Sequence, residues 1–402
     1  MMRPTLKALA AGLIVAWLVA PGLTQAVEKP EIKPSDLHIP YKLPEAELPD
    51  FTYRCGDTDC GRDAFMRRVG VCALLAMKGD RWLTYYNPDL YACPGENGTP
   101  RANDATRLYG IASVTKSITS TLLGFALQGG PVPPQGGLDL TLLQRPISNF
   151  VTGLGASQSK GAYAGVPIER VLRMRSDAKF NEQGADARRL RQLFDTRELS
   201  SLDFLRGLRR AGSQDGRFNY AGADSQAIGL LVEQLSGTSM FGYIWSRLWN
   251  PLGMESRAKW AVDWRSTPAA YCCLSATAPD LLRFGKFVLD RGSNMAGTPL
   301  LSPDWFDAAT STTDPEGDKI PDTNISHNDA CPKTFPSLYR YQWWLFRDRS
   351  DFTGIGINGQ FLHVYPDEDL VILQLAAWGD WSDARACESM AAHAAIAAML
   401  RD

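Results

Sequence analysis

The sequence is poor in histidine and lacks the spacings by which protein side chains usually hold zinc. Only four histidines occur among the 402 residues, and there is neither an HExxH motif nor a pair of CxxC motifs. Structural and catalytic zinc sites draw on such cysteine and histidine clusters. A metal site is therefore a poor interpretation of this chain.

Long runs of one charge and long apolar segments are also missing. The formal net charge is −2, from 42 basic and 44 acidic residues, and no run of one sign suggests a nucleic-acid partner. Arg188, Arg189 and Arg191 lie among acidic residues, which is typical of a solvated helix face. The apolar run from Ala8 to Ala20 is too short to span a bilayer comfortably, so we expect no stable membrane anchor.

The N-terminus has the order of segments that is typical of a secretory signal. Arg3 and Lys7 precede the apolar run, and small residues between Thr24 and Ala26 follow it. No cysteine follows closely, which argues against a lipoprotein anchor. We expect residues 1–26 to be removed by cleavage near Ala26, and the mature protein to reach a bacterial periplasm or to be secreted.

All the cysteines lie in the mature part, and their even number favours disulfides in an exported chain. The spacing weakly favours a small loop closed by Cys55 and Cys60 and leaves the other pairings open. The eight cysteines are Cys55, Cys60, Cys72, Cys93, Cys272, Cys273, Cys331 and Cys387.

The hydrophobic pattern predicts an α+β architecture with a helical insertion. Strands are predicted as a hairpin over 69–86 and again between 341 and 376, with a terminal helix over 384–400. A sheet assembled from both chain ends with helices between them has this architecture. We expect an extended N-terminal segment over 27–64 and one domain over 65–402, with its sheet part at about 65–112 and 266–402 and its helical part at about 113–265. Within that part, helices are predicted near 113–128, 168–175, 187–195, 201–211, 224–236 and 239–249.

The first of these helices carries a serine and a lysine that suit nucleophilic catalysis. Ser113 opens a strongly apolar helix, and Lys116 follows one turn later on the same face. The N–H groups at a helix N-terminus are unpaired and carry partial positive charge, so the Ser113 N–H could bind an oxyanion. The same field and a partly desolvated position favour a neutral Lys116 amine, which can take the proton of a serine hydroxyl.

The Ser-x-x-Lys pattern alone is weak, because it occurs four times in this sequence. The other pairs are Ser157/Lys160, Ser176/Lys179 and Ser256/Lys259, which lie in a polar loop or after the ends of probable helices. Only Ser113 opens a long apolar helix that would fix it against a core. The context therefore favours Ser113 and Lys116.

Two further stretches are candidates for the same site. Tyr220 directly precedes a predicted helix start, where its phenol could relay a proton if a cationic Lys116 stabilised its phenolate. The glycine-rich stretch 353–361 could bring a strand backbone close to a ligand. If it faces Ser113, the Gln360 N–H could be the second oxyanion donor. The alternatives are a tyrosine packed under a loop and an ordinary glycine-rich bend.

Together these three stretches resemble the three motifs of the class C β-lactamase-related serine hydrolases. They are Ser113-Val114-Thr115-Lys116, Tyr220-Ala221-Gly222 and Gly356-Ile357-Asn358-Gly359-Gln360. Further stretches resemble the branch that contains 6-aminohexanoate-dimer hydrolase and related esterases: Leu172-Arg173-Met174-Arg175-Ser176, Pro251-Leu252-Gly253-Met254, Cys272-Cys273-Leu274-Ser275 and Tyr341-Gln342-Trp343-Trp344.

The resemblance implies a β-lactamase/transpeptidase-like fold, with an antiparallel sheet flanked by helices and an inserted, mostly helical domain. Ser113 would be the acylated nucleophile, Lys116 its base and Tyr220 the proton relay. It implies no cofactor, and a small-molecule ester or amide as substrate.

Two positions depart from the family pattern, which has an asparagine where this chain has Gly222 and a lysine or histidine where it has Ile357. These two residues, with Asn358 and Gly359, would line the substrate site. Without a cation at Ile357 to hold a lactam carboxylate, we expect an esterase or short-amide hydrolase.

Other interpretations stay open. The protein could be a β-lactamase or a D-alanyl-D-alanine peptidase-like enzyme, or a non-catalytic exported binding protein of the same fold. A histidine-based triad using His363 or His393 is weak, because no Gly-x-Ser-x-Gly elbow occurs.

Overall fold

The protein is described from a computed structural model, which covers residues 29–37, 45–88, 101–130, 137–155, 161–212, 216–321, 331 and 334–401. The predicted signal segment, Cys93 and the Ser157/Lys160 pair lie outside these residues.

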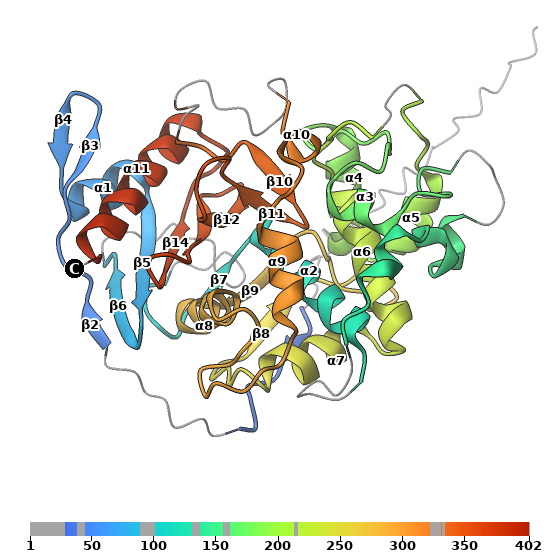
Figure 1. Ribbon diagram of the computed structural model, residues 1–402, viewed down its shortest axis with the longest axis horizontal. Helices are drawn as coiled ribbons and strands as arrows, with labels where there is room; N and C mark the ends of the chain where they lie inside the picture. Colours follow the sequence, from blue (N-terminus) through green and yellow to red (C-terminus); the bar gives the residue numbers. More distant parts are fainter. Residues whose placement is uncertain are drawn as a thin grey trace, which may run out of the picture.

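A large sheet forms the centre of the described chain (Figure 1). Its strand order is β10-β11-β12-β13-β14-β5-β6-β2, and all neighbours are antiparallel except β2 and β6. Both chain ends contribute strands, which confirms the predicted α+β architecture. The bounds are β2 Glu45–Glu47, β5 Val71–Lys78, β6 Arg81–Tyr86, β10 Leu338–Arg340, β11 Trp343–Leu345, β12 Phe352–Gly356, β13 Gln360–Tyr365 and β14 Leu370–Ala376.

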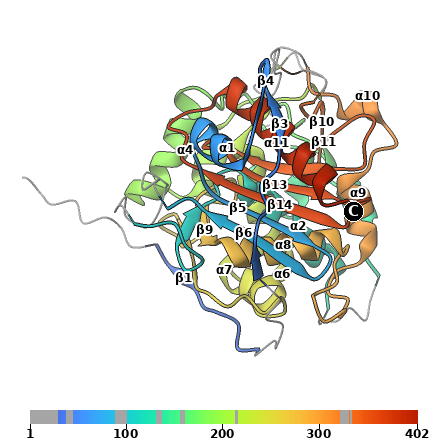
Figure 2. The same ribbon diagram turned by 90° about the vertical axis from the view of Figure 1, so that its left-hand side faces the viewer.

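Helices cover both faces of this sheet, so its central strands are buried throughout. On β13, Leu362 lies toward α8 (Ala278–Leu289), where it would be 2.9 Å from a Cβ placed on Gly285. Phe361 and His363 point to the opposite face, where both contact His393 of α11 (Asp383–Met399). This alternation follows from the pleat of the strand. Figure 2 views the β5 and β6 end of the sheet with α1 and α11.

A smaller sheet has the order β1-β8-β9-β7. Its bounds are β1 Glu31–Ile32, β7 Leu108–Gly110, β8 Ala258–Trp260 and β9 Leu274–Thr277. Two expectations need correction here. Strand β8 lies inside the predicted helical part of about 113–265, and the segment 27–64, which was expected to lie outside the domain, joins its fold through the pairing of β1 with β8. Short strands of this kind carry too few residues to show a period in the sequence.

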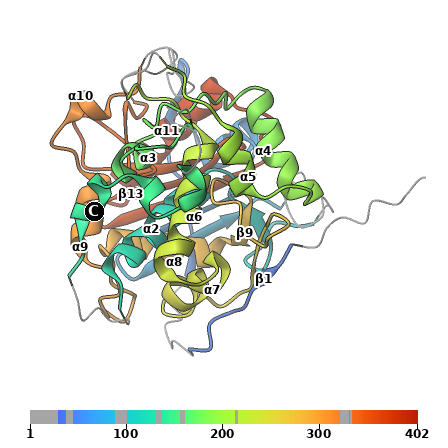
Figure 3. The same ribbon diagram turned by 90° about the vertical axis from the view of Figure 1, so that its right-hand side faces the viewer.

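The helical region lies on the side opposite β5 and β6, with α2 between it and the large sheet (Figures 1 and 3). The predicted helices are confirmed in existence, with shifted ends. The described helices are α1 Arg62–Val69, α2 Val114–Gln128, α3 Ile168–Leu172, α4 Ala185–Thr196, α5 Ser201–Gly207, α6 Gly222–Ser236, α7 Met240–Ile244, α8, α9 Pro303–Thr310, α10 Pro315–Asp318 and α11.

Three disulfides lie within the described residues. Cys55–Cys60 closes the hairpin of β3 (Tyr53–Cys55) and β4 (Thr58–Cys60), which confirms the predicted loop. The others join Cys331 to Cys387 and the neighbours Cys272 and Cys273.

Helix α2 is buried on nearly every side, and Gly124 marks its closest contact. A Cβ at Gly124 would lie 2.7 Å from the indole of Trp305, which is itself fully buried. Glycine is unfavourable in a helix interior, so its place here is set by this approach of the α9 indole.

We expect Gly124→Ala to lower the free energy of unfolding by about 1–3 kcal/mol, because the added methyl overpacks the contact with Trp305. Urea unfolding would measure the change. Gly207→Ala at the end of α5 is the control, since no atom lies within 4 Å of a Cβ there. Equal stabilities of the two variants would contradict this packing.

Candidate active site

Ser113 sits at a sharp junction between strand β7 and helix α2. Ile111 still bonds to the small sheet through its N–H to Leu274 O at 3.0 Å, and Ala112 then takes a positive φ of 46°. The first turn closes with the Val114 N–H to Ile111 O and the Lys116 N–H to Ser113 O. Ser113 is the half-buried N-terminal cap of α2, so its hydroxyl and N–H lie at the positive end of the helix.

Lys116 is the candidate base, and the structure places its amine beside this serine. Its Nζ lies 2.8 Å from Ser113 Oγ and donates to Tyr271 O at 3.0 Å. The side chain is 1% exposed. Burial lowers the pKa of Lys116 to about 8, partly opposed by the negative charge of Glu182. Burial therefore shifts Lys116 toward the neutral amine, in the direction that the sequence predicted, and the neutral form becomes the major one above about pH 8.

Tyr220 completes the group from the segment that leads into α6. Its side chain is hydrogen-bonded to Ser113, and Lys116 Nζ lies 4.8 Å from the centre of its ring. Burial and the charge of Glu182 raise the pKa of Tyr220 above its usual value. In this resting state burial thus opposes the phenolate that a cationic Lys116 was expected to favour. The raised pKa favours the protonated phenol in this state.

An aromatic wall holds the Tyr220 ring in place. The ring packs on Trp344 with centroids 5.2 Å apart and meets Tyr339 edge-on at 5.7 Å. The preceding Asn219 donates its side-chain amide to Phe180 O at 3.0 Å. Aromatic pairs of this geometry add to the stability of a site beyond the area that they bury.

Gly222 has a structural reason to be a glycine. A Cβ there would lie 2.9 Å from Cδ2 of Tyr271 and 3.3 Å from Oε2 of Glu182. The Gly222 N–H donates to that same oxygen at 2.6 Å. The Tyr271 ring and Glu182 thus occupy the space of a side chain at 222, and the other oxygen of Glu182 lies 3.9 Å from Lys116 Nζ. Glu182 was not predicted as a site residue, since a single glutamate in a turn shows no pattern in the sequence.

The glycines of strand β12 allow its backbone to approach the start of α2, as predicted. A Cβ on Gly354 would lie 3.1 Å from Ser117 Oγ, and one on Gly356 would lie 2.9 Å from Ile111 O. Strand β11 pairs with β12 only opposite Phe352 and Thr353. Beyond that point no described strand pairs with this edge of β12, whose backbone lies close to the turn that carries Ser113.

Gln360 is not the residue that this edge presents. It lies opposite Gly356 across the β12–β13 hairpin, and Gly356 O accepts the Gly359 N–H at 3.0 Å. Because backbone groups alternate between the two neighbours of an antiparallel strand, Gly356 points toward β13 and Ile357 points the other way. The Gln360 side chain turns to Ala376 O. The Ile357 N–H therefore replaces Gln360 as our candidate second oxyanion donor.

Of the other predicted substrate-site residues, Ile357 is 46% exposed beside the site. Asn358 donates its side-chain amide to Trp378 O at 2.8 Å. A Cβ on Gly359 would lie 2.4 Å from the indole of Trp378. Asn358 and Gly359 thus hold the turn through their contacts with Trp378.

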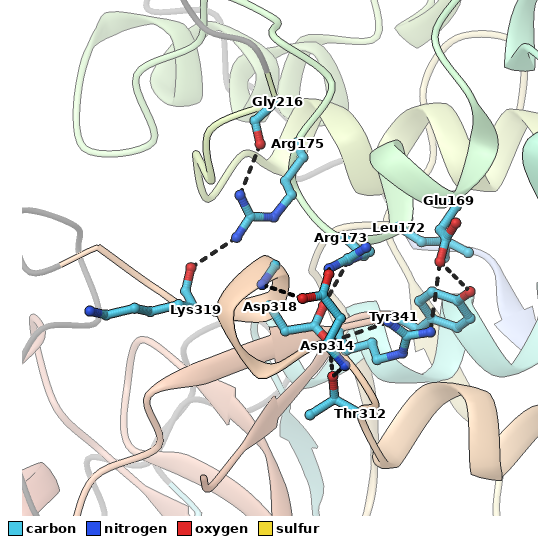
Figure 4. A network of polar contacts seen from close by, with 12 residues as sticks. Glu169, Leu172, Arg173, Arg175, Gly216, Thr312, Asp314, Asp318, Lys319 and Tyr341 are labelled. Atoms are coloured by element: carbon cyan, nitrogen blue, oxygen red, sulfur yellow. Dashed lines mark hydrogen bonds and ion pairs between the residues drawn. The ribbon is translucent and has the colours of Figure 1, made fainter.

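A polar network links the helical region to the strand region next to the site (Figure 4). Asp318 of α10 is fully buried and forms ion pairs with Arg173 at 2.7 Å and with Arg340 at 3.3 Å. Tyr341 OH donates to Glu169 Oε1 at 3.1 Å. Removing one partner would leave a buried charge uncompensated, so the network holds α3, α10 and β10 in fixed register.

The corner after β10 extends this connection to the catalytic helices. Tyr341 and Gln342 both have positive φ angles, of 42° and 68°. The side-chain amide of Gln342 donates to Leu172 O at 2.9 Å and accepts a hydrogen bond from the Ser225 hydroxyl at 2.6 Å. The backbone carbonyl of Gln342 accepts a hydrogen bond from Ser117 Oγ at 2.8 Å. One residue thus ties α2, α3 and α6 together.

The other described Ser-x-x-Lys pairs lack this geometry. Ser176 Oγ donates to the buried Asp224 at 2.6 Å, and Lys259 pairs with Glu31 at 3.3 Å. Their side chains serve local structure. Within the described residues, only Ser113 and Lys116 have the hydroxyl and amine of this motif in hydrogen-bond contact.

The histidine alternative loses support, because His363 and His393 are both fully buried between the sheet and α11. His363 Nε2 lies 2.8 Å from Asp351 Oδ2, and His393 Nε2 lies 3.1 Å from Gln374 Oε1. Burial lowers the pKa of both rings. These groups are hydrogen-bonded to one another and to the core, not to Ser113.

Comparison with known proteins agrees with this geometry. The family described as beta-lactamase matches residues 63–395. The chain belongs to the β-lactamase family. It is 28% identical over 281 residues to the 6-aminohexanoate-dimer hydrolase of Paenarthrobacter ureafaciens, an alignment covering 67% of this chain and 66% of that protein.

Solved structures of the β-lactamase family type share the fold. A provisionally assigned 6-aminohexanoate-dimer hydrolase from Bacillus anthracis superposes with a TM-score of 0.73 at 16% identity, covering 92% of this chain and 91% of that one. A penicillin-binding protein from Bacillus halodurans gives 0.58 at 17% identity, covering 83% and 99%. The protein is a serine hydrolase of β-lactamase type with the expected α+β fold.

The described residues of this β-lactamase family member contain no group of three or more histidine, cysteine, aspartate or glutamate side chains placed to hold a metal ion. None of their helices is both long and apolar enough to cross a bilayer.

The buried Lys116 leads to an expected pH dependence of hydrolysis. Lys116 can accept the Ser113 proton only when neutral, and its pKa of about 8 means that the neutral fraction grows as pH rises through that value. We expect kcat/KM for a p-nitrophenyl ester to rise about tenfold per pH unit below the midpoint and to level off above it. Subtraction of the Ser113→Ala rate removes the background. A midpoint near 6.5 would instead indicate a histidine base.

Proposed function

We propose that the protein cleaves ester or short amide bonds through a covalent acyl-enzyme on Ser113. The observation that carries the proposal is the 2.8 Å contact between Nζ of the buried Lys116 and Oγ of the half-buried Ser113. A desolvated amine beside a serine hydroxyl at a helix N-terminus is an activated nucleophile. The bound Tyr220 adds a proton donor at the same oxygen.

In the proposed acylation, neutral Lys116 takes the Ser113 proton as Oγ attacks the substrate carbonyl carbon. The N–H groups of Ser113 and Ile357 stabilise the oxyanion. As the bond to the leaving group breaks, Tyr220 donates its proton to the departing oxygen or nitrogen, and the Lys116 ammonium then reprotonates Tyr220. Water, deprotonated by the same pair, then attacks the acyl carbon; the bond from that carbon to Ser113 Oγ breaks, the pair returns the proton to Oγ, and the acid product leaves.

The residues at the mouth support a substrate without the carboxylate of a β-lactam. Ile357 is apolar where a cation would hold that group, and no side chain fits at Gly222. A lost charge-assisted hydrogen bond costs on the order of 1.5–3 kcal/mol, or tenfold or more in binding. The sequence relative from Paenarthrobacter ureafaciens, a 6-aminohexanoate-dimer hydrolase, supports short amides beside esters.

We also propose that the protein is exported, with residues 1–26 as its signal segment. Disulfides form and persist in oxidising compartments. The pairs Cys55–Cys60, Cys272–Cys273 and Cys331–Cys387 support this location.

We expect Ser113→Ala to lower p-nitrophenyl ester turnover by a factor on the order of 10³ or more. Its free energy of unfolding should change by at most about 1 kcal/mol, because a half-buried hydroxyl contributes little to the core. Peptide mass analysis after a fluorophosphonate probe should find the label on Ser113. Full turnover by the variant, or a label on Ser176 or Ser256, would refute the assignment.

The same preparations assayed with nitrocefin test the substrate class. We expect its kcat/KM to lie well below that of short esters. A higher value for nitrocefin would favour the alternative of a β-lactamase or peptidase-like enzyme. Absence of both activities and of the label would favour a non-catalytic binding protein.

The oxyanion role of Ile357 is open to a backbone test. Ile357 follows Gly356 at the first central position of the hairpin turn, where proline is well tolerated, so Ile357→Pro removes the N–H and little else. We expect kcat to fall about 10²–10³-fold, as for other lost oxyanion donors. Ile357→Ala keeps the N–H and is the matched control. Equal kcat in the two variants would exclude this donor.

A further inference from the structure

Glu182 lies in a turn that places its carboxylate at the catalytic lysine. The turn directly precedes α4, and its backbone is fixed at both ends. Asn181 N–H donates to Asp186 Oδ2 at 3.0 Å, and Gln183 N–H donates to Asn181 Oδ1 at 3.0 Å. Glu182 itself is mostly buried, with 18% of its side chain exposed. The residue is therefore held inward by its own loop.

The two oxygens of Glu182 have separate partners. Oε2 accepts the Gly222 N–H at 2.6 Å, at the positive end of helix α6. Oε1 lies 3.9 Å from Lys116 Nζ. The helix thus anchors the carboxylate in the orientation that directs its second oxygen to the amine. Within the part of the chain that the structure describes, Glu182 is the carboxylate in ion-pair contact with Lys116.

Acylation makes this carboxylate important, because Lys116 becomes an ammonium when it takes the Ser113 proton. An unpaired charge in a desolvated pocket is costly, whereas a paired one is tolerated. The other groups that face Lys116 are the rings of Tyr220 and Tyr271, centred 4.8 and 5.7 Å from Nζ. Neither carries a full negative charge, since burial raises the pKa of both phenols.

We propose that Glu182 is a positioning residue that stabilises the ammonium form of Lys116 during acylation and so sets the pH range of the reaction. The proposal rests on the proposed function of Ser113 and Lys116. Glu182 acts through Lys116, and the glycine at 222 is what leaves room for it.

Asp224 also titrates close to Glu182, and its contribution to the pH profile has to be distinguished from that of Lys116. Asp224, in the first turn of α6, is fully buried and accepts from Ser176 and Tyr163. Burial raises the pKa of Asp224 to about 7, and the charge of Glu182 adds to this effect. Loss of the Glu182 charge would move both titrations in the same direction.

The test is the pH profile of the Glu182→Gln variant for a p-nitrophenyl ester. The glutamine oxygen can still accept the Gly222 N–H, so the fold is kept while the charge is lost. We expect the midpoint of the kcat/KM profile to move toward lower pH by about 0.5–1, and the plateau kcat to fall about tenfold. Glu182→Asp should restore part of both.

Two control variants make the result specific. Asp195→Asn removes the same charge from an exposed position on α4 and should leave the midpoint where it is. In an Asp224→Asn background the Glu182→Gln displacement should persist, since Lys116 still titrates.

The outcomes separate the proposals. If Glu182→Gln keeps the wild-type midpoint and plateau while Ser113→Ala is inactive, Glu182 serves only as a helix cap and this inference is wrong. If Glu182→Gln no longer moves the midpoint of the kcat/KM profile in the Asp224→Asn background, the titration seen in that profile belongs to Asp224. The inference is then also wrong. If Ser113→Ala retains full activity, the proposed function itself fails.

Discussion

The constraint on which the site depends is the burial of one amine, Lys116, against one hydroxyl, Ser113. A lysine in a desolvated pocket gives up part of its proton affinity, and this makes it useful as a base near neutral pH. The same burial makes the proton that it gains expensive to hold. Tyr271 O accepts a hydrogen bond that orients the amine, and the Glu182 carboxylate lies 3.9 Å from it. The packing of α2 keeps this arrangement from relaxing.

Much of this could be predicted from sequence where the information is local. Helix α2 has its apolar residues at helical spacing, and Ser113 and Lys116 follow as its first turn. The central strands were also predictable, because a strand buried on both faces appears as a short apolar run between turn residues. Tyr220 needed the resemblance as well as its position before a helix. The raised pKa of Tyr220 depends on burial, which no local pattern reports.

The rest depends on contacts between distant segments. Glu182 belongs to a turn with no periodicity, and its role exists only because α6 and α2 meet beside it. The exchange of Gln360 for Ile357 follows from which edge of β12 is free, and that depends on how far β11 extends. A shift of one residue along a strand reverses the direction of every backbone group. Sequence motifs identify the strand, but they do not show which of its backbone N–H groups point toward the site.

Gly222 shows how a departure from a family pattern can mislead when it is taken by itself. In the sequence, glycine stands at this position where the family pattern has an asparagine, so the side-chain amide of that asparagine is missing from the site. In the structure its place is filled by Glu182 from the far side of the site, and by the ring of Tyr271. A neutral amide is thus exchanged for a carboxylate 3.9 Å from the base. Such an exchange alters the charge around Lys116 more than it alters the shape of the pocket. The absence of a polar side chain at this position is therefore compatible with the close contact between Lys116 and Ser113.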